Sequence, residues 1–194
     1  MSFLKYYNLY FFLDSTNLIW FKRLIFSASF LTLCVVVFGA FVRLTDSGLG
    51  CPDWPGCFGT LTVPESATAI NEAQNSYPGT IVDVTKAWYE MIHRYLAGIL
   101  GLLILTIAIF SYKIRDQLRV RLILPFSILV LVIFQAALGM WTVTELLKPA
   151  IVTLHLMGGM TILGLLTYMT HRHIGTVSNT IILNPGIKPL IRFG

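Results

Sequence analysis

The sequence predicts an all-α membrane protein: a four-transmembrane-helix bundle with a long outward-facing loop between the first two helices. The composition indicates the membrane, because 56% of the 194 residues are hydrophobic and only 12% are charged. A soluble domain of this size needs a more polar surface. The apolar residues form four runs, at 21–42, 92–112, 122–143 and 150–169. Each has about the 20 residues with which a helix crosses a hydrocarbon core, and a helix satisfies its own backbone hydrogen bonds in lipid.

These runs divide the chain into three parts. Residues 21–170 are the predicted bundle, with the extracytoplasmic loop at 44–89. Residues 1–20 are aromatic, carry Asn and Asp, and lack a small-residue cleavage site. They are therefore interpreted as an interfacial segment and not as a signal peptide. Residues 171–194 are expected to be a cytoplasmic tail or the start of a further helix.

Basic residues gather before the first run, between the second and third, and after the fourth. The long loop instead holds five acidic residues against Lys86 alone. By the positive-inside rule both termini are cytoplasmic in a multi-pass protein of the cytoplasmic membrane. The net charge of +5 does not indicate nucleic-acid binding, because the basic residues lie in the linkers and not on one face.

Two of the three cysteines, Cys51 and Cys57, lie in the short stretch GLGCPDWPGCFG of this loop, whereas Cys34 lies in an apolar run. A disulfide is the favoured interpretation, because the loop is on the oxidising side of the membrane. A metal site is the alternative, but the nearby loop offers no histidine. Such a bond either staples the loop, or belongs to a lid or an electron-exchanging pair.

Two histidines stand near the outer ends of predicted helices that run in the same direction, His93 in the second and His155 in the fourth. In a four-helix bundle, such a pair can bind one metal from opposite sides. Small residues follow each histidine by four positions, Ala97 and Gly159, which leaves clearance for a flat tetrapyrrole. The sequence therefore suggests a bis-histidine haem. Hydrogen-bonded core histidines and ordinary close helix packing remain open as alternatives.

Further polar residues surround this pair. Glu90 precedes His93 by three residues, on the same helix face. It is a candidate partner of the ligand, a candidate general base, or a solvated residue of the first helical turn. Arg94, with the other basic residues of the outer face, either binds propionates or is an ordinary interfacial charge. His171 and His173 are interpreted as a basic flank, since the inner end of the second run offers no histidine to pair with them.

Three stretches together resemble the haem A synthase family: FVRLTDSGLGCPDWPGCFG, KAWYEMIHRYLAG and QAALGMWTVTELLKPAIVTLHLMGG. The resemblance covers about residues 30–165 and follows the family's order. It implies an oxidoreductase that converts the C8 methyl of haem O to the formyl group of haem A for cytochrome c oxidase, with water as the oxygen source. It further implies that His93 and His155 are the axial ligands of the haem iron, that Glu90 is the catalytic carboxylate, and that Cys51 and Cys57 pair.

The usual family member has two similar four-helix halves, and this sequence resembles the first. The second half binds a haem b cofactor, which is then expected from a missing second half or from a second copy in a homodimer. Haem O synthase and cytochrome oxidase assembly factors are the expected protein partners, with membrane lipid around the bundle. Two other functions stay open: a b-type cytochrome that passes electrons, which has no use for Glu90, and a non-catalytic haem-handling assembly protein.

Overall fold

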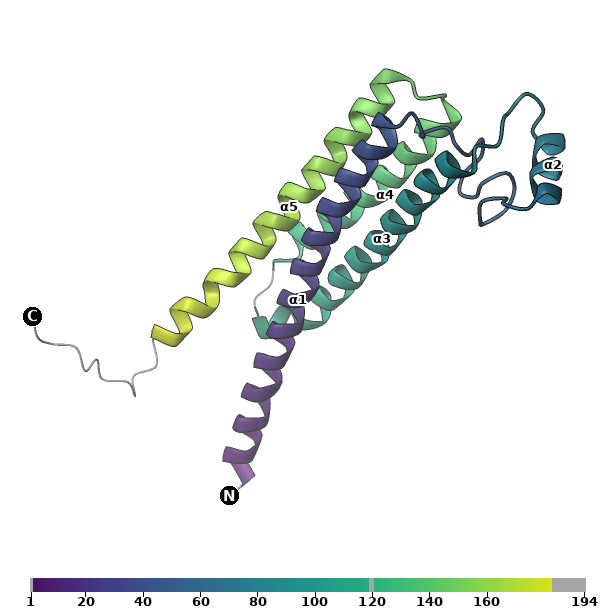
Figure 1. Ribbon diagram of the computed structural model, residues 1–194. Coiled ribbons are helices and arrows are strands. Elements are labelled where there is room, and N and C mark those ends of the chain that lie inside the picture. Colours follow the sequence, from purple (N-terminus) through teal and green to yellow (C-terminus); the bar gives the residue numbers. More distant parts are fainter. Residues whose placement is uncertain (1, 119–120, 183–194) are drawn as a thin grey trace, which may run out of the picture.

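Four long helices and one short helix make up the fold in the computed structural model, which describes residues 2–118 and 121–182 (Figure 1). Side chains are described for residues 16–116 and 121–172. No strand occurs in these ranges, which confirms the predicted all-α class. The helices are α1 (Ser2–Leu44), α2 (Ala67–Ser76), α3 (Val84–Leu118), α4 (Ile123–Thr144) and α5 (Pro149–Ile182).

The four long helices form a bundle in which each packs against two others. Helix α1 packs on α3 and α5, and α4 packs on the same two helices. Helices α3 and α5 are therefore diagonal neighbours that face each other across the interior, as are α1 and α4. Helix α2 stands apart from the bundle, in the segment 45–83 that joins α1 to α3 (Figure 1). We call the end of the bundle where this segment joins α1 to α3 the loop end.

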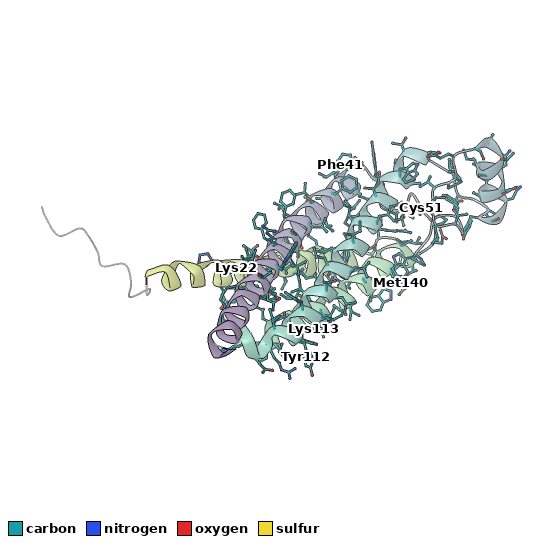
Figure 2. The ribbon with its side chains drawn as sticks, turned by 90° about the horizontal axis from the view of Figure 1, so that it is seen from below. Lys22, Phe41, Cys51, Tyr112, Lys113 and Met140 are labelled. Atoms are coloured by element: carbon teal, nitrogen blue, oxygen red, sulfur yellow. A yellow bond between two sulfur atoms is a disulfide. The ribbon has the colours of Figure 1, made fainter. Side chains whose placement is uncertain are left out.

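The bundle has the properties of a membrane domain. Within the described residues, four helical stretches are long and apolar enough to cross a membrane, in α1, α3, α4 and α5. Their outer faces carry exposed large side chains such as Phe30, Leu102 and Val130, which a protein in water would bury. Figure 2 shows Lys22 and Lys113 at the end opposite Cys51, so these two basic residues lie away from the loop end.

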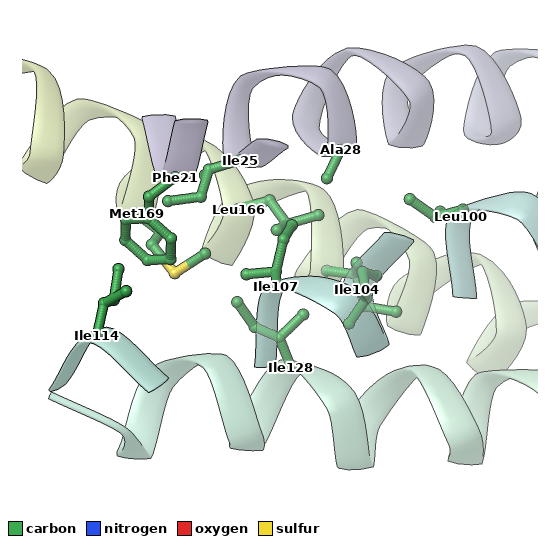
Figure 3. Close-up of a cluster of buried hydrophobic side chains, with 11 residues drawn as sticks. Phe21, Ile25, Ala28, Leu100, Ile104, Ile107, Ile114, Ile128, Leu166 and Met169 are labelled. Carbon is green, nitrogen blue, oxygen red and sulfur yellow. The ribbon is translucent and has the colours of Figure 1, made fainter. Parts of the chain in front are cut away.

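A buried apolar cluster fills the half of the bundle opposite the loop end (Figure 3). Branched and aromatic side chains of all four long helices interdigitate there, because each helix turns an apolar face inward. On α3 the cluster begins at Leu100 and on α5 at Ile162. Each lies seven residues, about two helical turns, beyond a histidine of the same helix, His93 or His155. The apolar core therefore stops short of the level of the two histidines.

Several element boundaries differ from the prediction. Helix α1 runs through the expected boundary at residue 20, so residues 2–20 continue the first spanning helix; their place at a membrane interface stays a prediction. Helix α3 begins at Val84, so the loop is shorter than 44–89. Helix α2 was not expected from the sequence. Ser66 caps its N-terminus, because the side-chain oxygen of Ser66 accepts the backbone N–H of Ala69 at 3.1 Å.

At the C-terminal side, α5 continues to Ile182, beyond the predicted end of the bundle at residue 170. Residues 171–182 are therefore helical, and the rest of the predicted tail, 183–194, lies outside the described residues. His171 lies on this extension, and the side chain of His173 lies outside the described part, so their interpretation as a basic flank stays a prediction. The cytoplasmic placement of the tail stays a prediction.

Candidate functional site

The two histidines come from the diagonal pair of helices, His93 from α3 and His155 from α5. Each ring packs on a glycine of a neighbouring helix. A Cβ on Gly39 of α1 would lie 2.8 Å from Cε1 of His93, and a Cβ on Gly139 of α4 would lie 3.2 Å from Cε1 of His155. Both contacts are closer than ordinary van der Waals packing, so a side chain larger than hydrogen would displace the ring.

Both rings lie at the same depth of the bundle. Gly159 of α5 contacts Val36 of α1, since a Cβ there would lie 3.5 Å from the Cγ2 atom of Val36. His155 is four residues, about 6 Å, nearer the loop end than Gly159. Four residues from Val36 toward the loop end, α1 reaches Ala40, which is next to Gly39, and Gly39 contacts the ring of His93.

The donor set favours an iron porphyrin over a bare metal ion. No group of three or more His, Cys, Asp or Glu side chains that would hold a metal ion occurs in the described part of the chain. A bare ion needs at least three protein ligands, whereas the iron of a porphyrin already has four nitrogens and needs only axial ligands. The Nδ1 atoms of both rings are enclosed and have no hydrogen-bond partner among the described residues. Two imidazoles from diagonal helices, at one depth and beyond the end of the apolar core, are a donor set that a haem iron would accept.

The glycine contacts make one testable prediction. In the Gly39→Ala variant the new Cβ pushes the His93 ring away from its position, so we expect about tenfold weaker haem binding and an altered low-spin absorption spectrum. Titration of the purified protein with haem B measures both. Gly98→Ala on α3 is the control, because a Cβ there meets nothing within 4 Å. Equal spectra and affinities in the two variants would contradict the packing role of Gly39.

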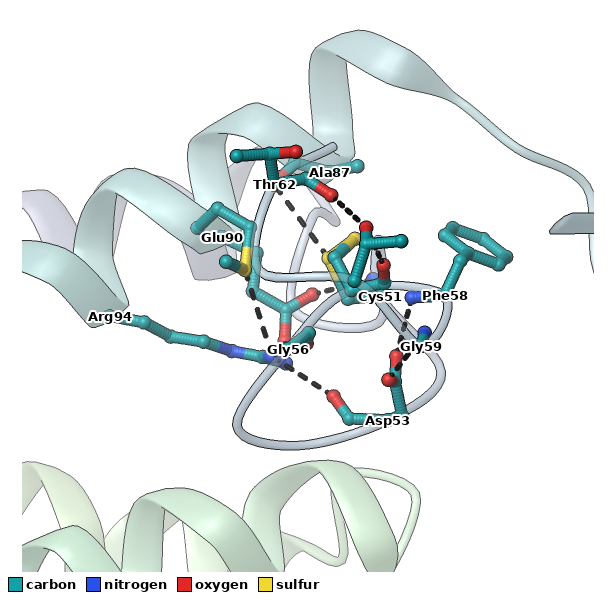
Figure 4. Close-up of a disulfide and its surroundings, with 12 residues drawn as sticks. Cys51, Asp53, Gly56, Phe58, Gly59, Thr62, Ala87, Glu90 and Arg94 are labelled. Atoms are coloured by element: carbon teal, nitrogen blue, oxygen red, sulfur yellow. Dashed lines mark hydrogen bonds and ion pairs between the residues drawn. A yellow bond between two sulfur atoms is a disulfide. The ribbon is translucent and has the colours of Figure 1, made fainter. Parts of the chain in front are cut away.

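Glu90 lies one turn before His93 on α3 and is 5% exposed, so it is not the solvated first-turn residue that the sequence left open. Both oxygens of its carboxylate accept a hydrogen bond. One oxygen accepts the backbone N–H of Cys51 at 2.9 Å, and the other accepts from the guanidinium of Arg94 (Figure 4). Glu90 therefore joins the helix that carries His93 to the loop that contains both cysteines, residues 48–59, which we call the cysteine loop.

Arg94 completes this link from the same helix. Besides Glu90, its guanidinium donates to the backbone carbonyl oxygens of Asp53 at 2.9 Å, Pro55 at 3.3 Å and Gly56. The guanidinium thus faces the cysteine loop, and its predicted contact with a haem propionate stays a prediction. A charged donor that binds three carbonyls of one loop holds that loop in a single position.

The cysteine loop is closed by further bonds of its own (Figure 4). Cys51 and Cys57 form a disulfide, as predicted, and both are fully buried. The carboxylate of Asp53 accepts the backbone N–H groups of Phe58 at 2.6 Å and Gly59 at 2.8 Å. A Cβ on Gly50 would lie 2.6 Å from the backbone of Lys86, so only glycine lets the loop approach α3 this closely. These contacts hold the cysteine loop against the first turns of α3.

The structure therefore brings Glu90, His93, Arg94 and the disulfide together on and beside α3, with His155 opposite. Gly159 lies between Val36 and Gln135, with room for a Cβ at ordinary distances, so its role in haem clearance stays a prediction. The sequence analysis missed Gly39 and Gly139. A glycine within each apolar run was the available signal, but no rule of spacing links it to a histidine on another helix.

Comparison with known proteins gives one family. Residues 22–191 match the COX15-CtaA family of cytochrome oxidase assembly proteins. The chain is similar to the haem A synthase of Shewanella oneidensis, with 49% identity over 135 residues, and to that of Oceanobacillus iheyensis, with 32% identity over 147 residues. These alignments cover 70% and 76% of the chain.

The same alignments cover 40% and 43% of the two relatives, so the chain spans less than half the length of the curated proteins it matches. The haem A synthase of an Exiguobacterium species shows the same proportion, with 33% identity over 69% of this chain and 40% of that protein. No solved structure is detectably similar to the chain.

Proposed function

Because the chain belongs to the COX15-CtaA family of cytochrome oxidase assembly proteins, we propose that it acts in haem A biosynthesis as haem A synthase or as half of one. The proposed reaction is oxidation of the C8 methyl of haem O to the formyl group of haem A. The observation that carries the proposal is the pair of opposed imidazoles at one depth, with a buried carboxylate one helical turn from His93.

Haem O enters this proposal as the substrate, held by His93 and His155 through its iron. The bound macrocycle supplies a conjugated system through which electrons leave the methyl carbon. Each hydroxylation takes its oxygen from water and releases two electrons and two protons, and the second one yields the formyl group after loss of water. We propose that the electrons leave one at a time through a haem b cofactor in a partner half or in a second copy of this chain, and that an acceptor of the quinone class, in its two-electron reduction, takes them up.

In this reaction the protein residues position the substrate, stabilise charge and move protons. His93 and His155 fix the plane of the macrocycle between α3 and α5. The carboxylate of Glu90 stabilises positive charge that builds at the reacting carbon and accepts a proton from the attacking water. Arg94 and the backbone N–H of Cys51 hold that carboxylate in place. The loop end, where the polar connecting segment lies, supplies the water.

The placement in the cell is part of the proposal. We place the protein in the cytoplasmic membrane with both termini cytoplasmic and the loop end outside. The distribution of charge supports this, since Lys22 and Lys113 lie at the end opposite Cys51 (Figure 2). The proposed partners are a missing second half or a second copy of the chain, with haem O synthase and oxidase assembly factors.

Mass analysis of the haems extracted from the purified protein tests the proposed function. The protein is produced in cells that make haem O and lack any other haem A synthase. We expect haem O, its hydroxylated forms and haem A in the extract. Haem B alone, with a low-spin spectrum, would assign the chain to the b-type cytochromes, and bound haem O that never changes would leave only a haem-handling role.

A further inference from the structure

Gln135 is a polar side chain in the middle of the apolar helix α4, and none of the steps above uses it. Its side-chain Nε2 donates a hydrogen bond to the backbone carbonyl oxygen of His155 on α5. Its Oε1 is enclosed and has no hydrogen-bond partner within the described part of the chain. The amide therefore makes one side-chain bond, and that bond ends on the proposed haem ligand.

The space for this amide exists because residue 158 is glycine. A Cβ on Gly158 would lie 2.1 Å from Oε1 and 3.1 Å from Cδ of Gln135. Such a distance is not compatible with any side chain at position 158 unless Gln135 moves. Gly158 follows His155 by three residues, so the side-chain amide of Gln135 lies within one helical turn of His155, against the backbone of α5.

Helix α4 thus contacts the ligand segment at two points. Gly139 and Gln135 are four residues apart and share one face of α4. Gly139 packs against the ring of His155, and Gln135 binds its backbone carbonyl. The first contact limits the rotation of the ring, and the second limits rotation and sliding of α5 at this depth.

Stability alone does not account for Gln135. An enclosed acceptor without a partner costs folding free energy, and an unbranched apolar side chain of similar size would fill the same space without that cost. An amide retained at such a cost points to a task that packing does not perform. Within the described part of the chain, the group that this amide holds is the backbone carbonyl of His155.

We propose that Gln135 is a positioning residue that fixes the height and rotation of His155, so that its imidazole meets the haem iron in line with His93. The proposal rests on the proposed haem site but not on the oxidation of haem O. Residues that orient metal ligands from outside the coordination sphere commonly change metal affinity by 10- to 100-fold when replaced.

Four variants of the purified chain test it, with haem B as the probe. Gln135→Met keeps the size and removes the hydrogen bond, and Gly158→Ala drives a Cβ into the amide. The double variant Gln135→Ala with Gly158→Ala is compared with Gln135→Ala alone. Gly164→Ala on α5 is the control, because a Cβ there meets nothing within 4 Å. Haem affinity, the EPR g-values of the low-spin iron and thermal unfolding of the haem-free protein are measured.

We expect about tenfold weaker haem B binding and shifted g-values in Gln135→Met and in Gly158→Ala, with haem-free unfolding no lower than in the wild type for Gln135→Met. In the Gln135→Ala background, Gly158→Ala should have almost no further effect, because the clashing amide is gone. Unchanged g-values and affinity in Gln135→Met, or additive effects of the two alanine substitutions, would overturn the proposal. A parallel His155→Ala variant that kept its low-spin spectrum would instead remove the ligand assignment.

Discussion

Replacement of His93 or His155 by alanine is expected to abolish the low-spin haem spectrum, with the loss complete in either single variant. In the proposed site each imidazole would supply one axial ligand, so removal of one would leave five-coordinate, high-spin iron. The rings come from diagonal helices and lie at one depth, so no other described histidine can replace the missing one. Absorption and EPR spectra of the purified protein loaded with haem B measure the effect.

His171→Ala is the matched control for this experiment. His171 lies sixteen residues beyond His155, about 24 Å along α5, on the far side of the apolar core. Its removal should leave the spectrum and the affinity unchanged. A complete low-spin spectrum in His93→Ala or in His155→Ala would show that the pair does not share one iron, and the proposed function would lose its support.

Replacement of Glu90 by glutamine is expected to leave haem binding intact and to lower the formation of haem A by at least about 100-fold, the usual contribution of a positioned acid or base. Glutamine still offers an oxygen to the backbone N–H of Cys51, so the cysteine loop keeps one of its bonds to α3. It carries no negative charge, and it cannot accept a proton from water. The haem content and the haem A yield are measured on the same preparation.

Glu65→Gln is the control for the loss of a carboxylate that links the connecting segment to α3. Glu65 accepts the indole N–H of Trp88 at 2.7 Å, so it anchors the segment as Glu90 does but at an exposed position. We expect wild-type haem A yields from it. Unreduced haem A formation in Glu90→Gln would remove the catalytic role, and a parallel loss of haem would limit Glu90 to holding the cysteine loop.

Glu90→Ala should be more damaging to the structure than Glu90→Gln. Both substitutions remove the ion-pair partner of the buried Arg94 guanidinium, and only alanine also leaves the N–H of Cys51 without an acceptor. A buried charge whose partner is removed costs about 3–5 kcal/mol of folding free energy. A comparison of thermal unfolding in the two variants separates the structural part of the Glu90 contribution from the chemical part.

The sequence alone was sufficient for the four spanning helices, the disulfide and the positions of both histidines along their helices. These depend on local properties: the length of an apolar run, the spacing of two cysteines in one loop, and the number of residues from a helix end. Helix α2 was missed because it is short and its ten residues carry little apolar periodicity, although Ser66 before it and Pro78 after it are start and stop signals. The start of α3 was placed too late because Lys86 and Glu90 interrupt the apolar pattern.

What the sequence determined by itself is that this chain crosses a membrane four times and carries two histidines at matching depth, since apolar length and residue count set both. Only the tertiary structure decided that Gly39 backs His93, that Gly139 and Gln135 hold His155, and that Arg94 faces the cysteine loop. The reason is that spanning helices are apolar on every side. Their periodicity therefore does not reveal which face turns inward, and contacts between helices depend on that rotation.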